Sequence, residues 1–417
     1  MKRYRFVRKC LRPTAFIVAA CLFFSSFGLF LSGCGRTTSE DGTTEGTESA
    51  AGKSDLAIVD SMDLQYATQF SVDYYEDGYV HIHIEDGRDY VLIPSGAEAN
   101  NLGLEDATIL YADDVQKSIY LAASSAMDLF LQLDQLDVIK TCSTTADDYS
   151  MEEVKQAIHD GDMTYVGKYS APDYETLLAA NTGLAIESTM IYHSPKIQEE
   201  LENIGIPVLI ERSSYEETPL GRLEWIKLYG VLLGCEEEAN QFFDEQAAKV
   251  EELTASLDDK TQEESQSESV EGTGDTAPTV AFFYISSNGY VNIRKPGDYL
   301  SKMMEIAGGT YAFSDLNIEE DNALSTLNIN WEDFYKEAKD ADILIYNGTI
   351  DGGVNSIEEL EEKNALFADF KAVKEGNVYC TNLNMFQESS KIADIILDFH
   401  SIFCGDTTDL QYLKALE

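Results

Sequence analysis

The sequence predicts an α/β protein in which two lobes, each built on a mainly parallel sheet, are joined by a long helix. Three observations predict this arrangement. Short apolar runs alternate with helical segments from residue 119 to residue 210, the alternation returns after residue 279, and a long helical stretch separates the two regions. Strands and helices that alternate at this length are typical of parallel sheets covered on both faces.

The folded part is predicted to begin with antiparallel strands. Apolar residues alternate over 70–74 and 80–84 around the turn Glu76-Asp77-Gly78, and a second turn at Asp86-Gly87 leads to residues 90–93. Such alternation around glycine turns predicts a hairpin or meander. His81 and His83 share one face of it. They are either metal ligands or part of a half-exposed face, and the lack of a third ligand nearby favours the second.

The first lobe, residues 55–217, continues with five predicted strands and four predicted helices. The strands are expected at 119–121, 138–140, 164–166, 184–186 and 208–210, and the helices at 126–133, 151–159, 174–179 and 195–204. Thr218-Pro219 then opens the interlobe helical segment 218–257, with threonine as N-cap and proline in the first helical position. Gly234 interrupts this segment after about Leu233.

An acidic stretch, 258–278, separates the interlobe segment from the second lobe, 279–417. It is poor in apolar residues, which predicts a disordered insert. The second lobe repeats the alternation. Strands are expected at 280–284, 343–346 and 378–380, and helices at 299–307, 331–338 and 389–403.

The N-terminal residues predict a lipoprotein signal peptide over 1–33. Six basic residues precede an apolar stretch that ends in Leu31-Ser32-Gly33-Cys34, which resembles a bacterial lipobox. This resemblance implies lipid attachment at Cys34 on the extracytoplasmic face of the cell membrane; the alternative is an uncleaved membrane anchor. Residues 34–54 are rich in Gly, Ser, Thr and acids and predict a flexible tether.

Composition excludes several classes of function. A formal charge of −46 is incompatible with the basic patches that nucleic-acid binding needs. The motifs of nucleotide-binding enzymes, serine hydrolases and zinc proteases do not occur, so no catalytic residue, intrinsic cofactor or metal site is predicted. The cysteines show no zinc-binding spacing, and the sequence does not decide whether Cys380 and Cys404 form a disulfide.

Ligands of open α/β sheets bind beyond the carboxyl ends of the strands. In this chain the loops in those places carry tyrosine, methionine, serine and arginine, which suits a large ligand with flat or apolar parts and negative groups. Trp225 and Tyr192 are equally open to core packing or ligand contact, whereas the pattern favours a ligand or an ion pair between elements for Arg222 and Arg212. Trp225 and Arg222 lie about one turn apart and share a face of the interlobe helix. The predicted ligand-binding residues are Ser124, Ser125, Tyr169, Met190, Tyr192, Arg212, Tyr215, Arg222, Trp225, Tyr284 and Arg294.

Several segments together resemble the solute-binding lipoproteins of ABC importers for iron–siderophore complexes, haem and cobalamin. They are YLAASSAMDLFLQL, VGKYSAPDYETLLAANTGLAIES, ELENIGIPVLIERSSYEETPLGRLEWIKLYGVLLGCEEEA, KPGDYLSKMMEIAGG and WEDFYKEAKDADILIYNG. The second segment resembles the family pattern G-x-x-x-x-P-x-x-E, with Thr182-Gly183 where the family has Pro-Asp.

The resemblance implies two Rossmann-like lobes on a long interlobe helix, closing to a limited extent around a metal chelate or tetrapyrrole. It implies a monomeric, non-enzymatic receptor that delivers this ligand to an ABC permease and its ATPase. By motif position, Glu175 and Glu332 would dock onto arginines of the permease; as ordinary helix residues they would interact only with the helix dipole. The alternative is an extracytoplasmic lipoprotein without a transport role that binds a metal, acts as a sensor or serves as an interaction module.

Overall fold

The computed structural model describes residues 56–266, 277–316 and 325–417. The predicted signal peptide, Cys34 and the predicted tether therefore lie outside the described residues. Within the described ranges, no helix combines the length and the apolar character that crossing a bilayer requires.

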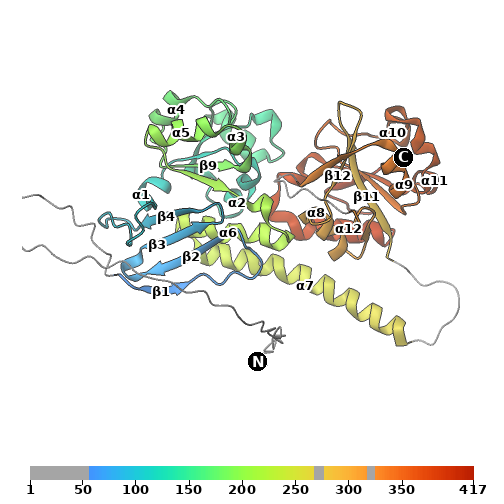
Figure 1. The fold of residues 1–417 in the computed structure, drawn as a ribbon, viewed down its shortest axis with the longest axis horizontal. Helices are drawn as coiled ribbons and strands as arrows, with labels where there is room; N and C mark the ends of the chain where they lie inside the picture. Colours follow the sequence, from blue (N-terminus) through green and yellow to red (C-terminus); the bar gives the residue numbers. More distant parts are fainter. Residues whose placement is uncertain (1–55, 267–276, 317–324) are drawn as a thin grey trace, which may run out of the picture. The chain divides into compact units, whose positions relative to one another are not determined.

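The first lobe is built on a five-stranded, fully parallel sheet, as predicted (Figure 1). Its strand order is β10-β9-β6-β7-β8. The strands are β6 (Ile119–Leu121), β7 (Ile139–Cys142), β8 (Thr164–Tyr165), β9 (Leu184–Ser188) and β10 (Val208–Glu211). The helices of this lobe are α1 (Ala112–Val115), α2 (Met127–Gln132), α3 (Glu152–Asp160), α4 (Tyr174–Ala179) and α5 (Pro195–Asn203).

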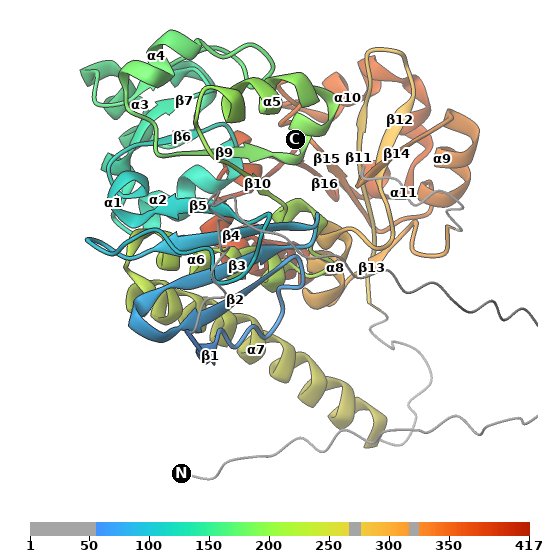
Figure 2. The same cartoon turned by 60° about the vertical axis from the view of Figure 1, so that its left-hand side comes forward.

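Two groups of buried side chains show which helices cover which face of this sheet. Leu177 of α4 and Leu201 of α5 pack with Tyr120, Ala185 and Ile210 on one face. The opposite face contributes residues such as Leu121 and Ile186 to a larger core that also contains side chains of α2 and α3. Figure 2 shows these strands with α4 and α5 above them. Both faces are covered, which explains why the strands read as continuous apolar runs.

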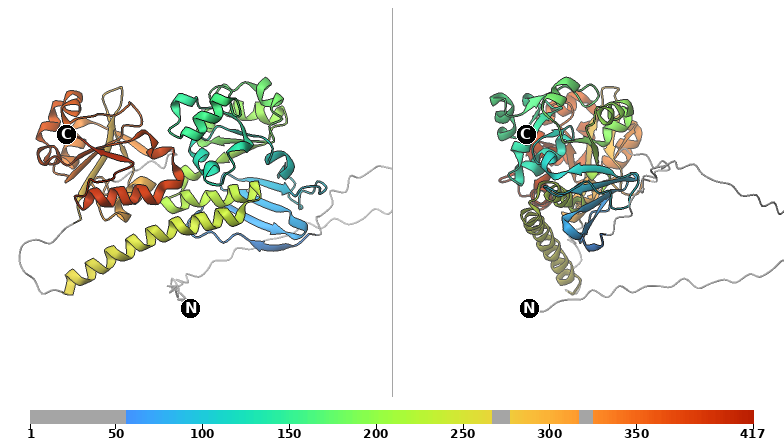
Figure 3. Two further views of the ribbon diagram at one scale, coloured as in Figure 1. Left: turned by 180° about the vertical axis from the view of Figure 1, so that it is seen from behind. Right: turned by 90° about the vertical axis from the view of Figure 1, so that its left-hand side faces the viewer.

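The predicted antiparallel meander is confirmed, and it belongs to a separate five-stranded sheet. The order is β1-β2-β3-β4-β5, and only β4 and β5 pair in parallel. The strands are β1 (Ile58–Ser61), β2 (Phe70–Tyr75), β3 (Val80–Ile84), β4 (Arg88–Ile93) and β5 (Thr108–Tyr111). We call this unit the appended sheet. Figure 3 shows it from behind, beside α6 and α7.

Helices α6 (Pro219–Leu233) and α7 (Glu236–Gln266) form the interlobe segment. Thr218 caps α6 by accepting a hydrogen bond from the amide of Gly221, as the sequence predicts. Gly234 ends α6 in the left-handed region, with φ of 72°, and the chain turns back into α7. Gly230 permits the close approach of the two helices, since a Cβ there would lie 2.7 Å from the Cβ of Ala239.

The appended sheet is fastened to α6 by two buried carboxylates. Glu224 and Glu216, which are 0% and 3% exposed, accept hydrogen bonds from five consecutive backbone amides, those of residues 65–69. The N···O distances are 2.8–3.1 Å. The ammonium group of Lys227 pairs with Glu224 at 2.8 Å. We call this arrangement the carboxylate clamp; it gives acceptors to five consecutive amides that no strand or helix pairs.

The second lobe is built on a mixed sheet of seven strands, in the order β14-β12-β11-β15-β16-β17, with β13 beside β11. Its central strands β11, β15 and β16 are parallel, and its edges are antiparallel. The strands are β11 (Thr279–Ile285), β12 (Val291–Arg294), β13 (Thr310–Tyr311), β14 (Thr326–Ile329), β15 (Ile343–Tyr346), β16 (Val378–Thr381) and β17 (Leu413–Ala415). The helices are α8 (Tyr299–Ile306), α9 (Trp331–Ala338), α10 (Ile357–Lys363), α11 (Lys371–Glu375) and α12 (Ile392–Phe403).

Two features of the secondary structure differ from what the sequence predicts. The predicted strand 280–284 continues into a hairpin, in which Tyr284 pairs with Asn292. The Ser-Asn-Gly turn that precedes an alternating strand was the overlooked signal. Helix α7 also continues beyond Leu257 to Gln266, into the predicted disordered insert; residues 267–276 of that insert lie outside the described ranges.

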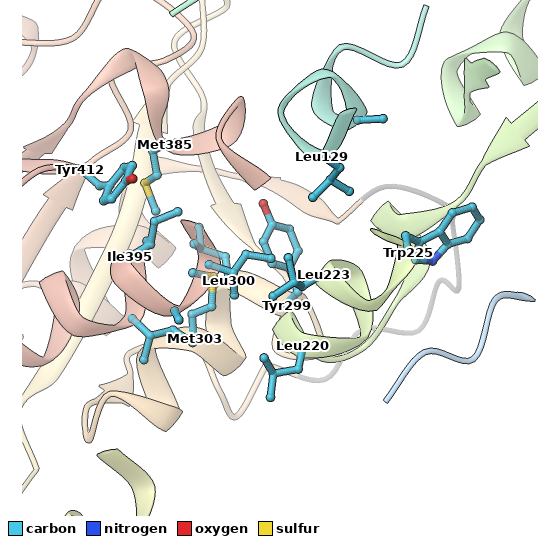
Figure 4. Packing of buried hydrophobic residues seen from close by; sticks show 14 of the residues in the cluster. Leu129, Leu220, Leu223, Trp225, Tyr299, Leu300, Met303, Met385, Ile395 and Tyr412 are labelled. Atoms are coloured by element: carbon cyan, nitrogen blue, oxygen red, sulfur yellow. The ribbon is translucent and has the colours of Figure 1, made fainter. Parts of the chain in front are cut away.

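The two lobes share one continuous apolar core around α6. Leu220 and Leu223 of α6 belong to the same buried group as Leu300 and Met303 of α8, and Figure 4 shows these side chains facing one another. Polar contacts add to this junction. The amide of Ser390 donates to Asp128 at 2.8 Å, across a separation of 262 residues.

Candidate functional site

The strand ends of the first lobe bring three of the predicted ligand residues together. The 3-10 turn Thr189–His193 follows β9, and the turn Ser213–Tyr215 follows β10. Arg212 donates to the hydroxyl of Tyr192 at 2.9 Å, and its guanidinium lies 4.4 Å from the ring centroid of Tyr215. Because β9 and β10 are parallel neighbours, the residues that follow them meet at one edge of the sheet.

Gln69 of the appended sheet completes this cluster. Its side-chain oxygen accepts hydrogen bonds from Nε and Nη2 of Arg212, at 3.2 and 2.9 Å. Of the five N–H donors of the guanidinium, two then have no protein partner among the described residues. A fixed arginine with two available donors can bind a carboxylate or another anionic oxygen. Sequence reasoning missed Gln69 because it lies 143 residues from Arg212, and no local pattern connects them.

Exposed apolar side chains gather at the carboxyl ends of the parallel strands in both lobes. In the first lobe they are Met190 and Tyr192, 46% and 38% exposed. In the second lobe, the segments after β11, β15 and β16 carry Tyr290, Ile350 and Leu383, which are 52%, 61% and 62% exposed. Large apolar side chains at equivalent ends of two sheets indicate a binding surface. Tyr290, Ile350 and Leu383 are not among the predicted ligand-binding residues, although each of them follows a predicted strand.

Arg222 lies at the junction of the lobes. Its guanidinium is 4.5 Å from the ring centroid of Tyr299 at the start of α8. The adjoining space, which Met385 and Phe386 also line, has a volume of only about 10 Å³, room for about one water molecule. Burial raises the pKa of Glu211, and the charge of Arg222 partly offsets this increase. Arg222 therefore contacts Tyr299 of the second lobe, and its charge acts on the buried Glu211. Its ligand role stays a prediction.

Arg294 is likewise engaged within its own lobe. Its guanidinium lies 5.0 Å from the ring centroid of Phe386, and it donates to Ser325 at 2.9 Å. It is also 3.8 Å from the carboxylate of Asp298, which is 7% exposed. Burial raises the pKa of Asp298, and the positive charge of Arg294 opposes that shift. Arg294 thus neutralises a buried acid near the junction.

Trp225 was predicted to contact ligand, and the structure corrects this. The side chain is fully buried. Its indole N–H donates to Glu216 of the carboxylate clamp at 2.9 Å, and its ring packs edge-on against Phe70 with centroids 5.0 Å apart. Figure 4 shows it apart from the group around Leu300. Because every polar atom of the indole is satisfied internally, Trp225 fastens the appended sheet to α6.

The other predicted ligand residues lie in different places. Ser124 and Ser125 are half-buried in the turn after β6, and the carbonyl of Ser125 accepts a 2.7 Å hydrogen bond from Ser389 across the lobe junction. Tyr169 packs against the apolar group under α4 and α5. Tyr284 packs against the larger core from β11. The structure does not bring these four side chains together with Arg212.

Glu175 and Glu332 occupy comparable positions in the two lobes. Each lies in the first turn of a short helix, α4 and α9 respectively, and both are exposed. Neither forms an ion pair with another described residue. Their location fits the docking role that the resemblance implies.

The described residues contain no group of three or more histidine, cysteine or acidic side chains arranged to hold a metal ion. His81 and His83 both hydrogen-bond the same oxygen of Asp89, at 2.7 and 2.9 Å. Burial alone would raise the pKa of Asp89, but these two hydrogen bonds hold it below its usual value. Cys380 and Cys404 are free thiols, so the disulfide left open by the sequence is not formed.

Comparison with known proteins agrees with this geometry. The family described as periplasmic binding protein matches residues 122–382. Two uncharacterized lipoproteins of Methanocaldococcus jannaschii are 27% and 23% identical over 255 and 367 residues. The first match covers 60% of this chain and 55% of the relative, so the chain spans about half of that protein's length; the second covers 85% and 87%.

Two solved structures share the fold. A possible iron-binding periplasmic solute-binding protein from Staphylococcus epidermidis aligns with a TM-score of 0.51 at 17% identity, over 69% of this chain and 98% of that one. A periplasmic heme-binding protein from Pseudomonas aeruginosa aligns with a TM-score of 0.53 at 15% identity, over 72% and 95%. Both of these structures are of periplasmic binding proteins. The family match extends over well more than half of this chain, and the chain therefore belongs to the periplasmic binding protein family.

Proposed function

We propose that this protein is the extracytoplasmic solute-binding component of an ABC importer, and that it binds a metal chelate or tetrapyrrole between its lobes. The candidate ligands are an iron–siderophore complex, haem or a corrinoid. The observation that carries the proposal is the set of exposed apolar side chains at the carboxyl ends of both sheets, together with Arg212, which contacts one of them, Tyr192. A ligand with a flat or apolar body and acidic groups matches both features.

Family membership and the fold support a small-molecule ligand and an ABC permease as partners. The lipoprotein relatives support a lipid anchor, which we place on Cys34, at the extracytoplasmic face of the membrane. We expect the receptor to act as a monomer.

A binding panel tests the proposal. Haem, ferric siderophores and corrinoids are titrated into the mature chain, and binding is followed by ligand absorbance and tyrosine–tryptophan fluorescence. We expect one class to bind, and Arg212→Lys to weaken its binding about tenfold to a hundredfold, because lysine loses the two-pronged geometry and the Tyr215 contact.

Leu383→Ala tests the apolar surface of the second lobe, and Leu366→Ala is its matched control. Both leucines are exposed in the second lobe, at 42% and 62%, but only Leu383 follows a parallel strand. We expect Leu383→Ala to weaken binding and Leu366→Ala to leave it unchanged. Equal effects of the two variants, or no binding by any member of the panel, would contradict the proposal.

The docking role of Glu175 and Glu332 is tested by reversing both charges to lysine. In proteoliposomes that hold the cognate permease and ATPase, we expect the double variant to lose ligand-stimulated ATP hydrolysis and uptake, because the permease arginines would then face like charges. Ligand affinity should not change. The control is the exposed pair Glu199→Lys and Glu362→Lys, which adds the same charge elsewhere; an equal loss of uptake in that control would refute a docking role.

A further inference from the structure

The appended sheet lies outside the part of the chain that the family match covers. The match begins at residue 122, and β5, the last strand of the appended sheet, ends at Tyr111. The sheet packs beside the first lobe: the hydroxyl of Tyr90 in β4 donates to the carbonyl of Val208 in β10 at 2.7 Å, and Figure 2 shows the two strands as neighbours. Its role therefore has to be inferred from its own contacts.

Two contacts from one end of the appended sheet hold the side chains around Arg212. Gln69, immediately before β2, accepts hydrogen bonds from Nε and Nη2 of Arg212 at 3.2 and 2.9 Å. Asp86, in the turn between β3 and β4, accepts one from the hydroxyl of Tyr192 at 3.2 Å, and this hydroxyl accepts one from Nη1 of Arg212 at 2.9 Å. The amide of Glu85 donates to the carbonyl of Gln69 at 3.0 Å, so both contacts come from the same end of the sheet.

These contacts fix the guanidinium of Arg212 without neutralising its charge. Gln69 and the hydroxyl of Tyr192 are uncharged, and Asp86 pairs with Arg88 at 3.4 Å. Arg212 forms no ion pair with an acid in the described parts of the chain. Of its five N–H donors, one on Nη1 and one on Nη2 are left over. Two donors on neighbouring nitrogens match the two oxygens of a carboxylate.

The strand ends near the appended sheet differ from the others in this lobe. After β6, the carbonyl of Ser125 accepts a hydrogen bond from Ser389 at 2.7 Å, and after β7, the amide of Ser150 donates to the side-chain oxygen of Gln387 at 2.7 Å. Both partners belong to the second lobe. After β9, in contrast, Tyr192 is 38% exposed. The appended sheet therefore flanks strand ends that are accessible to a ligand.

We propose that the appended sheet makes the receptor selective for chelates with a free carboxylate, and that Gln69 is the positioning residue that holds Arg212 for this group. The proposal rests on the proposed function and narrows its substrate class. Haem, with its propionates, and iron complexes of carboxylate siderophores belong to the class. Corrinoids whose side-chain carboxyls are amides and neutral hydroxamate complexes do not.

Matched ligands test the selectivity of the mature chain. Haem and its dimethyl ester differ only in whether the propionates are free, a ferric carboxylate siderophore is compared with a neutral ferric trihydroxamate, and cyanocobalamin is the amidated corrinoid. Titrations are followed by ligand absorbance and protein fluorescence. We expect the acidic member of one pair to bind about tenfold to a hundredfold more tightly than the neutral member, because only a carboxylate makes charged hydrogen bonds with Arg212.

The outcomes separate this proposal from the proposed function. Binding by none of these ligands would refute both. Equal binding of the acidic and neutral members, or tightest binding of cyanocobalamin, would refute the selectivity and leave the role as an importer receptor standing.

Variants of Gln69 then assign the selectivity to the appended sheet. Gln69→Glu places a carboxylate against Arg212, and it should weaken binding of the acidic ligand about tenfold or more while the neutral ligand binds as before. Gln69→Leu removes the acceptor but adds no charge, so it should reduce the preference less than Gln69→Glu does. Unchanged affinity for the neutral ligand also shows that the variants fold.

Gln65→Glu is the matched control, because it adds the same charge to an exposed side chain of the same segment. We expect it to keep the preference of the parent protein. A purely structural role of Gln69 would weaken the acidic and the neutral ligand alike. That result, or an equal loss of preference in Gln65→Glu, would overturn the assignment to Gln69.

Discussion

Replacing Glu224 by alanine should destabilise the first lobe by about 3–5 kcal/mol, the usual cost of removing one partner from a buried charged network. The carboxylate accepts hydrogen bonds from the amides of Gln65, Tyr66 and Ala67 and from the ammonium group of Lys227. Alanine would leave the three amides without this acceptor, and Lys227 would keep only a 3.5 Å contact with the carbonyl of Asp63. Chemical denaturation followed by circular dichroism measures the loss.

Glu217→Ala is the matched control, because Glu217 lies in the same stretch but is exposed. We expect that variant to stay within about 0.5 kcal/mol of the parent protein. Hydrogen exchange gives a local readout: in Glu224→Ala the amides of residues 65–69 should exchange much faster. Similar stability of the two variants, with unchanged exchange at 65–69, would show that the carboxylate clamp contributes nothing.

Glu187→Gln should make the protein more stable at pH 8 while changing little at pH 4.5. Glu187 is fully buried in β9, and neither carboxylate oxygen has a hydrogen-bond partner among the described residues. Burial raises the pKa of this side chain from 4.5 to about 8. Below pH 4.5 the group is protonated in the folded and unfolded chains alike, so it adds no pH dependence there.

Between pH 4.5 and 8 the unfolded chain releases this proton and the folded chain retains it. The free energy of unfolding should therefore fall by up to about 1.4 kcal/mol per pH unit relative to Glu187→Gln. Above pH 8 the side chain is ionised in the folded and the unfolded chain alike, and the difference in free energy of unfolding between the parent and Glu187→Gln stops growing. Melting temperatures of both proteins across this range measure the effect.

Glu199→Gln controls for the loss of a carboxyl group, because Glu199 is exposed on α5; it should follow the parent curve throughout. If the melting temperature of Glu187→Gln also changes with pH as that of the parent does from pH 4.5 to 8, then Glu187 is not a neutral acid in the folded protein.

Local signals in the sequence were sufficient to predict most of the helices and strands. The turn Glu76-Asp77-Gly78 between alternating runs predicted the pairing of β2 with β3, and the Thr218-Pro219 cap predicted the start of α6. The predicted helix 331–338 has the bounds of α9. These features depend on neighbours within a few residues, and the physical signal is therefore complete in the local sequence.

The candidate site was only partly accessible to the same reasoning. The rule about strand ends located Met190, Tyr192, Arg212 and Tyr215, because in a parallel sheet the topology alone brings those positions to one edge. It did not separate them from Ser125 or Tyr169, which follow other strands but contact the lobe junction or the core. That difference depends on how each side chain packs after the turn.

The sequence by itself determined the alternation of strands and helices, the interlobe helix and the loops from which a ligand could be held, since each follows from local periodicity and capping. Only the tertiary structure decided what the large polar residues of 211–230 do. Trp225 and Glu224 could have faced a ligand; instead the Trp225 ring packs against Phe70, and Glu224 accepts hydrogen bonds from the amides of residues 65–67. Their partners lie about 150 residues away, and a hydrogen bond between such distant residues exists only once the chain has folded.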